Sequence, residues 1–238
     1  MQALILAGGK GTRLRPYTTV LPKPLMPVGD YPILEIILRQ LKHAGVHEVI
    51  LAVGHLGQLF QAFFEDGRRY GLKISYSYEE RALGTAGPIA LSLDRLEDDF
   101  LVMNGDLLTT LHYAELFAHH RTNKAAATIA LHHREVKIDF GVIESDEDHR
   151  LVRYIEKPTY SFQVSMGVNV LNKRAVVPYL QRDVPLDLPD LMMRLHQDGL
   201  KVSCFSEASY WLDIGRIDDY QTASEIFETR KAEFLPEE

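Results

Sequence analysis

Short apolar runs alternate with longer segments of helical period in the first half of the chain, and this alternation constrains the fold most strongly. The apolar runs predict strands at residues 2–6, 48–53, 73–78 and 100–103. Between them, apolar residues recur at intervals of three and four, which predicts helices at residues 33–45, 58–70 and 87–96. Strands that alternate with helices are typical of an α/β protein with a mainly parallel sheet.

The pattern changes from about residue 125, where apolar and polar residues alternate. This alternation predicts more exposed, antiparallel strands at residues 127–132, 140–144, 151–156 and 165–171. A helix at 188–197, a strand at 202–205 and a final helix from about residue 217 complete the expected elements.

Composition excludes several classes of protein. With 238 residues, 46% of them hydrophobic, the chain is long enough to bury a sizeable core. A net charge of -7 argues against a nucleic-acid partner, and no apolar run approaches the ~20 residues that span a membrane. The single cysteine, Cys204, cannot form an internal disulfide and suits a reducing cytoplasm; we expect it to be a small buried apolar residue.

A glycine-rich stretch, residues 6–16, directly follows the first predicted strand. It contains three glycines and three cations: Gly8, Gly9, Gly11, Lys10, Arg13 and Arg15. Glycines let a backbone approach a ligand closely and direct its N–H groups at phosphate oxygens. The planar guanidinium of Arg13 is suited to binding two phosphate oxygens at once.

Two familiar phosphate motifs are absent from this stretch. The P-loop pattern G-x-x-x-x-G-K-[ST] does not occur, and the third glycine of the dinucleotide fingerprint is replaced by Leu14. A simple glycine turn is the alternative interpretation. Lys23, between Pro22 and Pro24, favours a phosphate-binding loop over a simple turn. The flanking prolines stiffen the backbone from which a phosphate-binding lysine would extend. A solvated lysine in a proline-rich turn remains the alternative.

The glycine-rich residues 8–14, followed by Pro22-Lys23-Pro24, resemble the signature of the sugar nucleotidyltransferase (NDP-sugar pyrophosphorylase) family. The resemblance continues in the family's order through residues 83–87, 104–106, 140–142, 156–158, 167–169 and 211–215. It implies a Rossmann-like, GT-A-like nucleotidyltransferase fold with a mixed, mainly parallel sheet and a small sugar-binding β lobe.

We therefore expect one nucleotidyltransferase domain over residues 1–238. Residues 1–124 would form mainly the nucleotide-binding lobe, 125–215 mainly the sugar-phosphate-binding part and 216–238 the C-terminal helix. We also expect no left-handed β-helix domain of the kind that many family members append.

The resemblance also implies roles for individual residues. Arg13 would bind the β- and γ-phosphates, Lys23 the α-phosphate, and these two with Asp106 would be catalytic. The nucleotide-binding residues would be Leu6, Ala7, Gly8, Gly9, Gly11, Thr12, Arg13, Lys23, Glu79, Gly84, Thr85, Asn104, Gly105 and Asp106. Sugar hydroxyls would contact Gly141, Glu156 and Asn169, the sugar phosphate would contact Lys157, and Asp106 and Asp213 would hold Mg²⁺.

Elementary chemistry supports these roles independently. Ligands of open α/β sheets bind beyond the carboxyl ends of strands, where Gly8 and Asp106 are expected. Mg²⁺ needs only one or two carboxylates besides phosphates and water. Each residue also has a structural alternative: an aspartate after a strand can cap a helix, and Glu156 with Lys157 can form an exposed ion pair. The histidines at 112, 119, 120, 132 and 133 are expected to serve packing.

The expected reaction joins a nucleoside triphosphate to a sugar 1-phosphate and releases pyrophosphate. The second pKa of a phosphate monoester lies near ~6, so the attacking dianion needs no general base at neutral pH. Catalysis would then consist of positioning and charge neutralisation by Mg²⁺, Arg13, Lys23 and Lys157.

Residues 78–87 resemble mannose-1-phosphate guanylyltransferases within the family. Glu79 falls where many uridine- and thymidine-specific relatives carry glutamine, and a carboxylate can accept from the N1 and N2 donors of guanine. GTP and mannose 1-phosphate are therefore the expected substrates, although Glu79 and Glu80 as solvated charges are an alternative.

Several other functions remain open at this point. A uridylyl- or thymidylyltransferase would act on heptose, glucose or N-acetylmuramic acid phosphate, and a nucleotide-sugar sensor would lack catalysis. A glycosyltransferase is disfavoured, because residues 104–106 read Asn-Gly-Asp and not Asp-x-Asp. We expect a cytoplasmic enzyme without nucleic-acid or membrane partners, and leave open whether it is a homodimer.

Overall fold

A seven-stranded mixed sheet forms the centre of the computed structural model, which describes residues 1–9 and 11–235. Its strand order is β12-β8-β11-β6-β1-β4-β5. The strands are β1 (Gln2–Ala7), β4 (Glu48–Val53), β5 (Lys73–Tyr78), β6 (Asp99–Asn104), β8 (Ala127–Lys137), β11 (Thr159–Asn172) and β12 (Val202–Ser206). Only β11 runs antiparallel to its neighbours, β6 and β8. The predicted α/β fold with a mainly parallel sheet is confirmed. Lys10 of the glycine-rich stretch lies outside the described residues.

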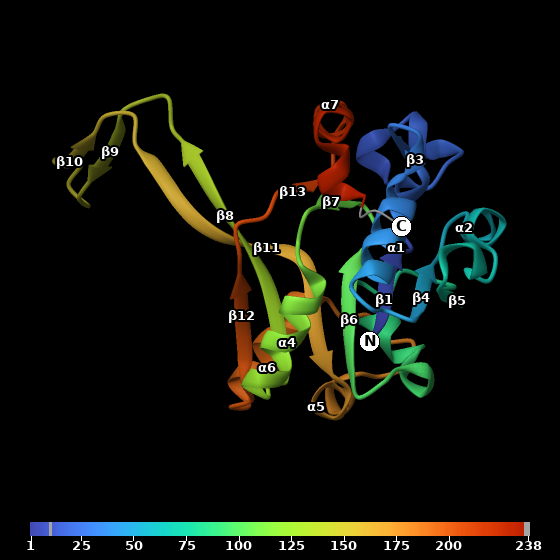
Figure 1. Ribbon diagram of the computed structural model, residues 1–238. Helices are drawn as coiled ribbons and strands as arrows, with labels where there is room; N and C mark the ends of the chain where they lie inside the picture. The colour runs from blue at the N-terminus through green and yellow to red at the C-terminus, as the bar shows by residue number, and fades with distance from the viewer. Residues whose placement is uncertain (10, 236–238) are drawn as a thin grey trace.

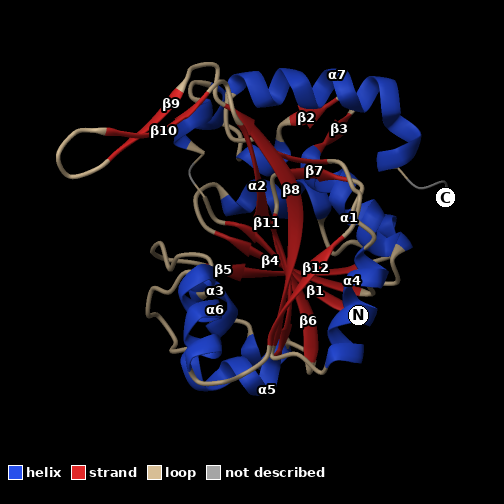
Figure 2. Cartoon of the chain, turned by 90° about the vertical axis from the view of Figure 1, so that its left-hand side faces the viewer, coloured by secondary structure: helices blue, strands red, loops and turns tan. Residues whose placement is uncertain are grey.

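Helices cover both faces of this sheet (Figure 2). One core cluster joins one sheet face to α1 (Ile33–His43), α2 (Gly57–Phe64), α4 (Tyr113–Asn123) and α7 (Ile217–Phe234). A second cluster joins the other face to α3 (Gly87–Ala90), α5 (Lys173–Val176) and α6 (Leu188–Gln197). Within β1, Ala3 and Ile5 belong to the first cluster and Leu4 to the second. Burial on both faces explains why the central strands β1 and β4 are almost continuously apolar in sequence.

Two predicted helices are shorter in the structure. The helix expected at 58–70 ends at Phe64, because Glu65 and Gly67 adopt positive φ values of 48° and 83°, and only a 3-10 turn (Arg68–Tyr70) follows. The segment 87–96 divides into α3 and a second 3-10 turn, Leu93–Arg95. The expected burial of Cys204 was also wrong. Its strand, β12, is the outermost of the sheet, and the side chain is exposed.

A long two-stranded arm extends from the sheet. Residues 132–137 of β8 and 159–164 of β11 pair only with each other, and β9 (Val142–Ser145) pairs with β10 (Leu151–Ile155) at the far end. Both pairs are antiparallel, as the alternating sequence predicted. Figure 1 shows the arm projecting away from the helices and the rest of the sheet.

Two small sheets complete the fold and help to build the site. Strand β2 (Pro27–Val28) pairs with β3 (Tyr31–Pro32). Strand β7 (Leu107–Thr109) pairs with β13 (Trp211–Asp213), and Asp213 lies opposite Leu107. Because Leu107 directly follows Asp106, this pairing brings the two aspartates together although they are far apart in sequence.

We expect Phe100→Ala to destabilise the fold by about 3–5 kcal/mol, because it leaves a cavity in the second core cluster, where Phe100 is fully buried. Urea unfolding measures the loss. The control Val20→Ala removes atoms from a residue that is 75% exposed and should change stability by less than about 0.5 kcal/mol. Equal losses in both variants would contradict this description of the core.

Candidate active site

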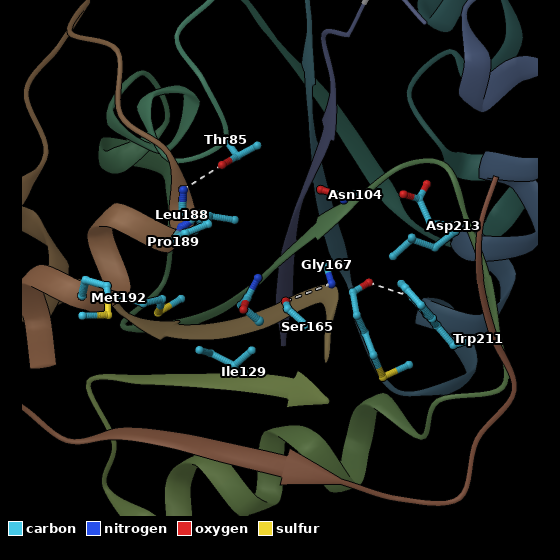
Figure 3. A pocket seen from close by; sticks show the side chains of 14 residues that line it. Thr85, Asn104, Ile129, Ser165, Gly167, Leu188, Pro189, Met192, Trp211 and Asp213 are labelled. Atoms are coloured by element: carbon cyan, nitrogen blue, oxygen red, sulfur yellow. Dashed lines mark hydrogen bonds between the residues drawn. The ribbon is translucent and has the colours of Figure 1, made fainter. Parts of the chain in front are cut away.

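Two adjoining cavities open at the carboxyl ends of β1 and β6. The first, the loop cavity, has a volume of about 380 Å³ and is lined by Leu6, Ala7, Gly8, Gly9, Gly11, Arg13, Lys23, Pro24, Glu79, Ala82, Leu83, Gly84, Thr85, Pro88, Asn104 and Asp106. The second, the tryptophan cavity, has a volume of about 500 Å³ and is lined by Asn169 among others. Figure 3 shows Trp211 and Asp213 at this cavity. Thr85 and Asn104 line both, so the two cavities share a wall.

The backbone of the glycine-rich loop comes very close to its neighbours. A Cβ atom at Gly8 would lie 2.6 Å from Oε1 of Glu79, and Gly11 has a positive φ of 57°. The Thr18 hydroxyl donates to the Gly11 carbonyl at 2.7 Å, and the Gly105 N–H donates to the Leu6 carbonyl at 3.0 Å. Glycine is therefore favoured at residue 11 by its left-handed backbone, and a larger residue at position 8 would displace the Glu79 carboxylate.

Lys23 projects from a 3-10 turn, Lys23–Leu25, between the two prolines. The Leu25 N–H donates to the Pro22 carbonyl at 2.9 Å, which fixes the turn. Lys23 is only 8% exposed, and its ammonium forms ion pairs with Asp106 and, at 3.3 Å, with Asp213. The alternative of a solvated lysine therefore does not describe this side chain.

The two aspartates face different cavities. Asp106 lines the loop cavity and Asp213 the tryptophan cavity, and the Lys23 ammonium lies between them. Burial raises the pKa of Asp106; the Lys23 ammonium opposes this change, and the Asp213 carboxylate adds to it. The junction of the cavities thus contains two carboxylates that share one cation.

Arg13 supplies a second cation to the loop cavity. Its guanidinium lies near Gly215, where an added Cβ would be 3.4 Å from Nη1. Within residues 1–9 and 11–235 the Arg13 side chain forms no ion pair, so all its donors are available to an anion in the cavity.

Glu79 and Glu80 have different environments. Glu79 is half-buried, lines the loop cavity and accepts a hydrogen bond from the Leu83 N–H at 3.3 Å, whereas Glu80 is exposed. Burial raises the pKa of Glu79, and the hydrogen bond from Leu83 partly opposes this change. Glu79 is therefore a carboxyl group placed to contact a bound ligand, and Glu80 is a solvated charge.

The loop that contains Gly84 is pinned against the start of α6. Gly84 has a φ of 74°, and a Cβ there would lie 2.6 Å from Oδ1 of Asp187. The Thr85 N–H donates to the same Asp187 oxygen at 3.0 Å, and the Leu188 N–H donates to the Thr85 hydroxyl at 2.7 Å. These bonds hold Thr85 at the wall between the two cavities (Figure 3).

Apolar side chains dominate the tryptophan cavity. It is lined by Thr85, Asn104, Leu107, Ile129, Ser165, Met166, Gly167, Asn169, Leu188, Pro189, Met192, Met193, Trp211 and Asp213. The Trp211 indole N–H donates to the Met166 carbonyl at 2.9 Å. Asn169 is buried, and its amide is one of the few polar groups that a ligand here can reach.

Most of the predicted site residues come together. All predicted nucleotide-binding residues line the loop cavity except Thr12, which is exposed, and Gly105, whose N–H donates to the Leu6 carbonyl. Asn169 and Asp213 line the tryptophan cavity, whereas Gly141, Glu156 and Lys157 lie on the arm and line neither cavity. Their predicted role in binding the sugar phosphate stays a prediction.

Sequence reasoning missed most of the wall of the tryptophan cavity. Trp211 could have been predicted from Asp213, because residues 211 and 213 of one strand lie on the same face. Met192 and Met193 gave no signal, since α6 reads as an ordinary amphipathic helix.

Of the histidines, His120 is buried and bonded to the Thr128 hydroxyl at 2.8 Å, and His132 contacts the Trp211 ring with centroids 5.4 Å apart.

A family model for nucleotidyl transferases matches residues 2–230. The chain belongs to this family. It is 36% identical to mannose-1-phosphate guanylyltransferase of Mycobacterium tuberculosis over 94% of this chain and 64% of the relative. It is 32% identical to UTP--glucose-1-phosphate uridylyltransferase of Synechocystis over 94% of this chain and 62% of the relative. The chain thus spans somewhat less than two thirds of the length of these two relatives, and the resemblance predicted from its motifs is confirmed.

Solved structures agree on the fold. A putative glucose-1-phosphate thymidylyltransferase from Bacillus anthracis superposes with a TM-score of 0.76 at 24% identity, covering 95% of each chain. HddC from Yersinia pseudotuberculosis gives 0.74 at 24% identity, covering 95% of this chain and 99% of HddC. In the part of this chain that the structure describes, no helix is both long and apolar enough to cross a bilayer.

We expect Gly84→Ala to destabilise the protein by more than about 2 kcal/mol, because it combines a left-handed backbone with a collision against the backbone carbonyl of Leu186, 2.6 Å from an added Cβ. Gly199→Ala is the matched control, since Gly199 has a φ of 77° but no atom within 4 Å of an added Cβ. Urea unfolding should show a smaller loss in the control. A Gly84→Ala variant as stable as Gly199→Ala would contradict the packing of this loop.

Proposed function

We propose that this chain transfers a guanylyl group from GTP to mannose 1-phosphate, forming GDP-mannose and releasing pyrophosphate. The observation that carries the proposal is the position of Lys23 between Asp106 and Asp213, where the two cavities meet. A reaction between two phosphate-bearing substrates needs such a junction, with one substrate on each side and countercharge between them. We also propose that residues 2–230, which the family model spans, act as one domain.

The loop cavity suits the triphosphate. Its glycine backbone can donate N–H groups to phosphate oxygens, and the guanidinium of Arg13, which forms no ion pair with another described residue, can bind the β- and γ-phosphates. Lys23 then binds the α-phosphate, and its ammonium stabilises the charge that develops there during transfer. Because Lys23 is buried and extends from a proline-flanked turn, its ammonium stays in place while substrates bind and products leave.

The sugar 1-phosphate occupies the tryptophan cavity in this proposal. Asn169 provides a buried amide for a sugar hydroxyl, and Trp211 provides a flat apolar surface for the sugar ring. A phosphate oxygen of the sugar attacks the α-phosphorus in line, and pyrophosphate leaves on the side of Arg13. Because a phosphate monoester is largely a dianion above its second pKa of ~6, no side chain has to remove a proton.

The donor set at the junction fits a magnesium ion. The carboxylates of Asp106 and Asp213 already converge on the Lys23 ammonium. Mg²⁺ that is also bound by substrate phosphates needs no more than one or two carboxylates from the protein. We propose that these residues hold Mg²⁺, which would neutralise phosphate charge. Among the described residues no cluster of three potential metal ligands occurs, so phosphates and water would complete the coordination.

Glu79 and the relatives together support guanine and mannose. Glu79 is half-buried at the loop cavity, where its carboxylate can accept from guanine N1 and N2. The mycobacterial relative is named a mannose-1-phosphate guanylyltransferase. Transfer of a uridylyl group to glucose 1-phosphate is the second candidate, because the Synechocystis relative of that name is 32% identical over 94% of this chain.

A cytoplasmic location belongs to the proposal, since the exposed thiol of Cys204 suits a reducing compartment.

Pyrophosphate release tests the proposal directly. The purified protein is mixed with Mg²⁺, with each of GTP, UTP, dTTP, CTP and ATP, and with a panel of sugar 1-phosphates. Release that requires both GTP and mannose 1-phosphate supports the proposal. Release with UTP and glucose 1-phosphate instead supports the second candidate, and no sugar-dependent release with any pair contradicts both.

Lys23→Ala and Asp106→Ala should each lower turnover by about 10²- to 10³-fold, because each removes a charge at the junction. The control is Arg15→Ala, which removes an exposed cation from the same loop that lines neither cavity. Steady-state kinetics on variants with native circular dichroism provides the measurement. Near-normal turnover in either folded variant would remove that residue from the mechanism.

GTP affinity should fall with decreasing pH through the raised pKa of Glu79. The ionised carboxylate accepts hydrogen bonds from guanine and the protonated one loses this capacity, so the fall begins above the ordinary value of 4.5. Glu79→Gln should flatten this profile and reduce the preference for GTP over UTP about tenfold or more. Calorimetric titration with both nucleotides tests this, and an unchanged preference would exclude Glu79 from base recognition.

A further inference from the structure

The strand that carries Asp213 is short, and Asp213 lies at its end. Strand β13 has three residues and forms a two-stranded sheet with β7. The Asp213 side chain is 43% exposed, whereas that of its partner Lys23 is 9% exposed. A strand of three residues has few hydrogen bonds to hold its last side chain in place. The position of the Asp213 carboxylate therefore depends on what holds the loop that follows.

Three successive backbone amides hold this loop. The Ile214 N–H donates to the Asp106 carbonyl at 3.3 Å, which joins the loop to the other aspartate of the junction. The next two amides, of Gly215 and Arg216, both donate to Oδ2 of Asp219, at 3.1 and 2.7 Å. Among the described residues, the Asp219 carboxylate is the single acceptor of the Arg216 N–H. The loop is thus held at its first amide by Asp106 and at the next two by Asp219.

Asp219 does more than cap the helix on which it lies. Helix α7 begins at Ile217, and the guanidinium of its N-cap residue, Arg216, has no acceptor with which to cap it. Asp219, the third helical residue, accepts from the N-cap amide, as in one half of a capping box. Its second bond goes one residue further back, to Gly215, which lies outside the helix. The carboxylate therefore fixes the loop that precedes α7 as well as the start of the helix.

Helix α7 gives Asp219 a fixed position. Ala223, Phe227 and Phe234 of this helix are fully buried in the first core cluster. The Phe227 ring packs edge-on against Tyr31 of β3, with centroids 6.2 Å apart. The Asp219 carboxylate thus extends from a helix that is packed against the body of the protein at several points, and the loop after β13 is fastened to that helix.

Asp219 also lies near the cation of the loop cavity. A Cβ at Gly215 would be 3.5 Å from Oδ2 of Asp219 and 3.4 Å from Nη1 of Arg13, so both charged groups border the same loop residue. The negative charge of Asp219 and its two hydrogen bonds are therefore separate contributions, and a test has to distinguish them.

We propose that Asp219 is a positioning residue for the metal-binding carboxylate of Asp213, and that it acts through the amides of Gly215 and Arg216. The inference rests on the proposed function, because the metal belongs to that proposal. Asp219 lines neither cavity, so it acts on the metal only through the loop. By holding the loop it keeps the Asp213 carboxylate beside that of Asp106 before a metal binds.

Three variants separate the contributions of Asp219. Asp219→Ala removes the charge and both hydrogen bonds, whereas Asp219→Asn removes the charge and keeps an oxygen that can accept from both amides. Asp218→Ala is the matched control. Asp218 lies in the same first turn and has the same favourable interaction with the helix dipole, but its carboxylate accepts from neither loop amide. All variants are compared at a temperature at which circular dichroism shows the native fold.

Hydrogen exchange of the metal-free protein measures how firmly the loop is held. The Arg216 amide should exchange about tenfold faster or more in Asp219→Ala than in the wild-type protein, because it loses its acceptor. In Asp219→Asn and Asp218→Ala the exchange rate should stay within about twofold of the wild-type rate. Unchanged exchange in Asp219→Ala, or equally fast exchange in either of the other variants, overturns the inference.

Binding of Mn²⁺ measures the consequence at Asp213 without turnover. Mn²⁺ takes the same oxygen ligands as Mg²⁺, and its unpaired electrons quench a nearby fluorophore. Trp211, the only tryptophan of the chain, lies in the same strand as Asp213 and lines the same cavity. With GTP present and sugar phosphate absent, the Mn²⁺ concentration that gives half of the quenching should rise about 10- to 100-fold in Asp219→Ala and less than about twofold in the other two variants. An unchanged concentration in Asp219→Ala leaves Asp219 a structural role alone and overturns the inference.

Turnover separates this inference from the proposed function. If the wild-type protein responds to Mn²⁺ but shows no sugar-dependent release of pyrophosphate, the proposed function fails, and the exchange and quenching measurements alone decide on Asp219. If release occurs, Asp219→Ala should need about 10- to 100-fold more Mg²⁺ for half-maximal turnover, and Asp219→Asn should restore the wild-type requirement. Lower turnover at every Mg²⁺ concentration with an unchanged requirement overturns the inference and leaves the proposed function intact. A wild-type protein whose Trp211 fluorescence does not respond to Mn²⁺ overturns the metal site and this inference together.

Discussion

The Lys23 ammonium, held between the carboxylates of Asp106 and Asp213, is the interaction on which the site depends. A nearly buried ammonium is costly unless it is paired, and two half-buried carboxylates of like charge are costly unless a cation lies between them. Three separate parts of the fold satisfy this requirement together. Asp106 follows the end of β6, Asp213 lies in β13 where this strand pairs with β7, and Lys23 lies in a proline-flanked turn.

The same arrangement gives the molecule two adjoining cavities in place of one. The glycine-rich loop after β1 shapes one side, and β11, α6 and Trp211 shape the other. The charges are distributed accordingly: a chain of net charge -7 concentrates Arg13 and Lys23 at the loop cavity and leaves the tryptophan cavity without a cation among its described lining residues.

The fold and the loop cavity were largely predictable, because their signals are local. Strands 2–7 and 48–53 are buried on both faces and read as apolar runs, and the left-handed glycines of the loops are required by positive φ values. The tryptophan cavity was less predictable. It is assembled largely from β11, β13 and α6, and no local pattern reveals that Met193 and Trp211 line the same cavity. The length of the arm was missed for a similar reason, since alternation predicts strands but not whether a sheet or solvent lies beside them.

Initial-rate kinetics with both substrates varied tests the central claim most directly. If the two cavities hold both substrates at once and Lys23 lies between them, transfer is direct and double-reciprocal plots at several fixed sugar 1-phosphate concentrations intersect. Parallel lines would show that pyrophosphate leaves before the sugar phosphate binds, through a covalent nucleotidyl-enzyme intermediate. That result would contradict a single displacement across the junction of Asp106, Lys23 and Asp213.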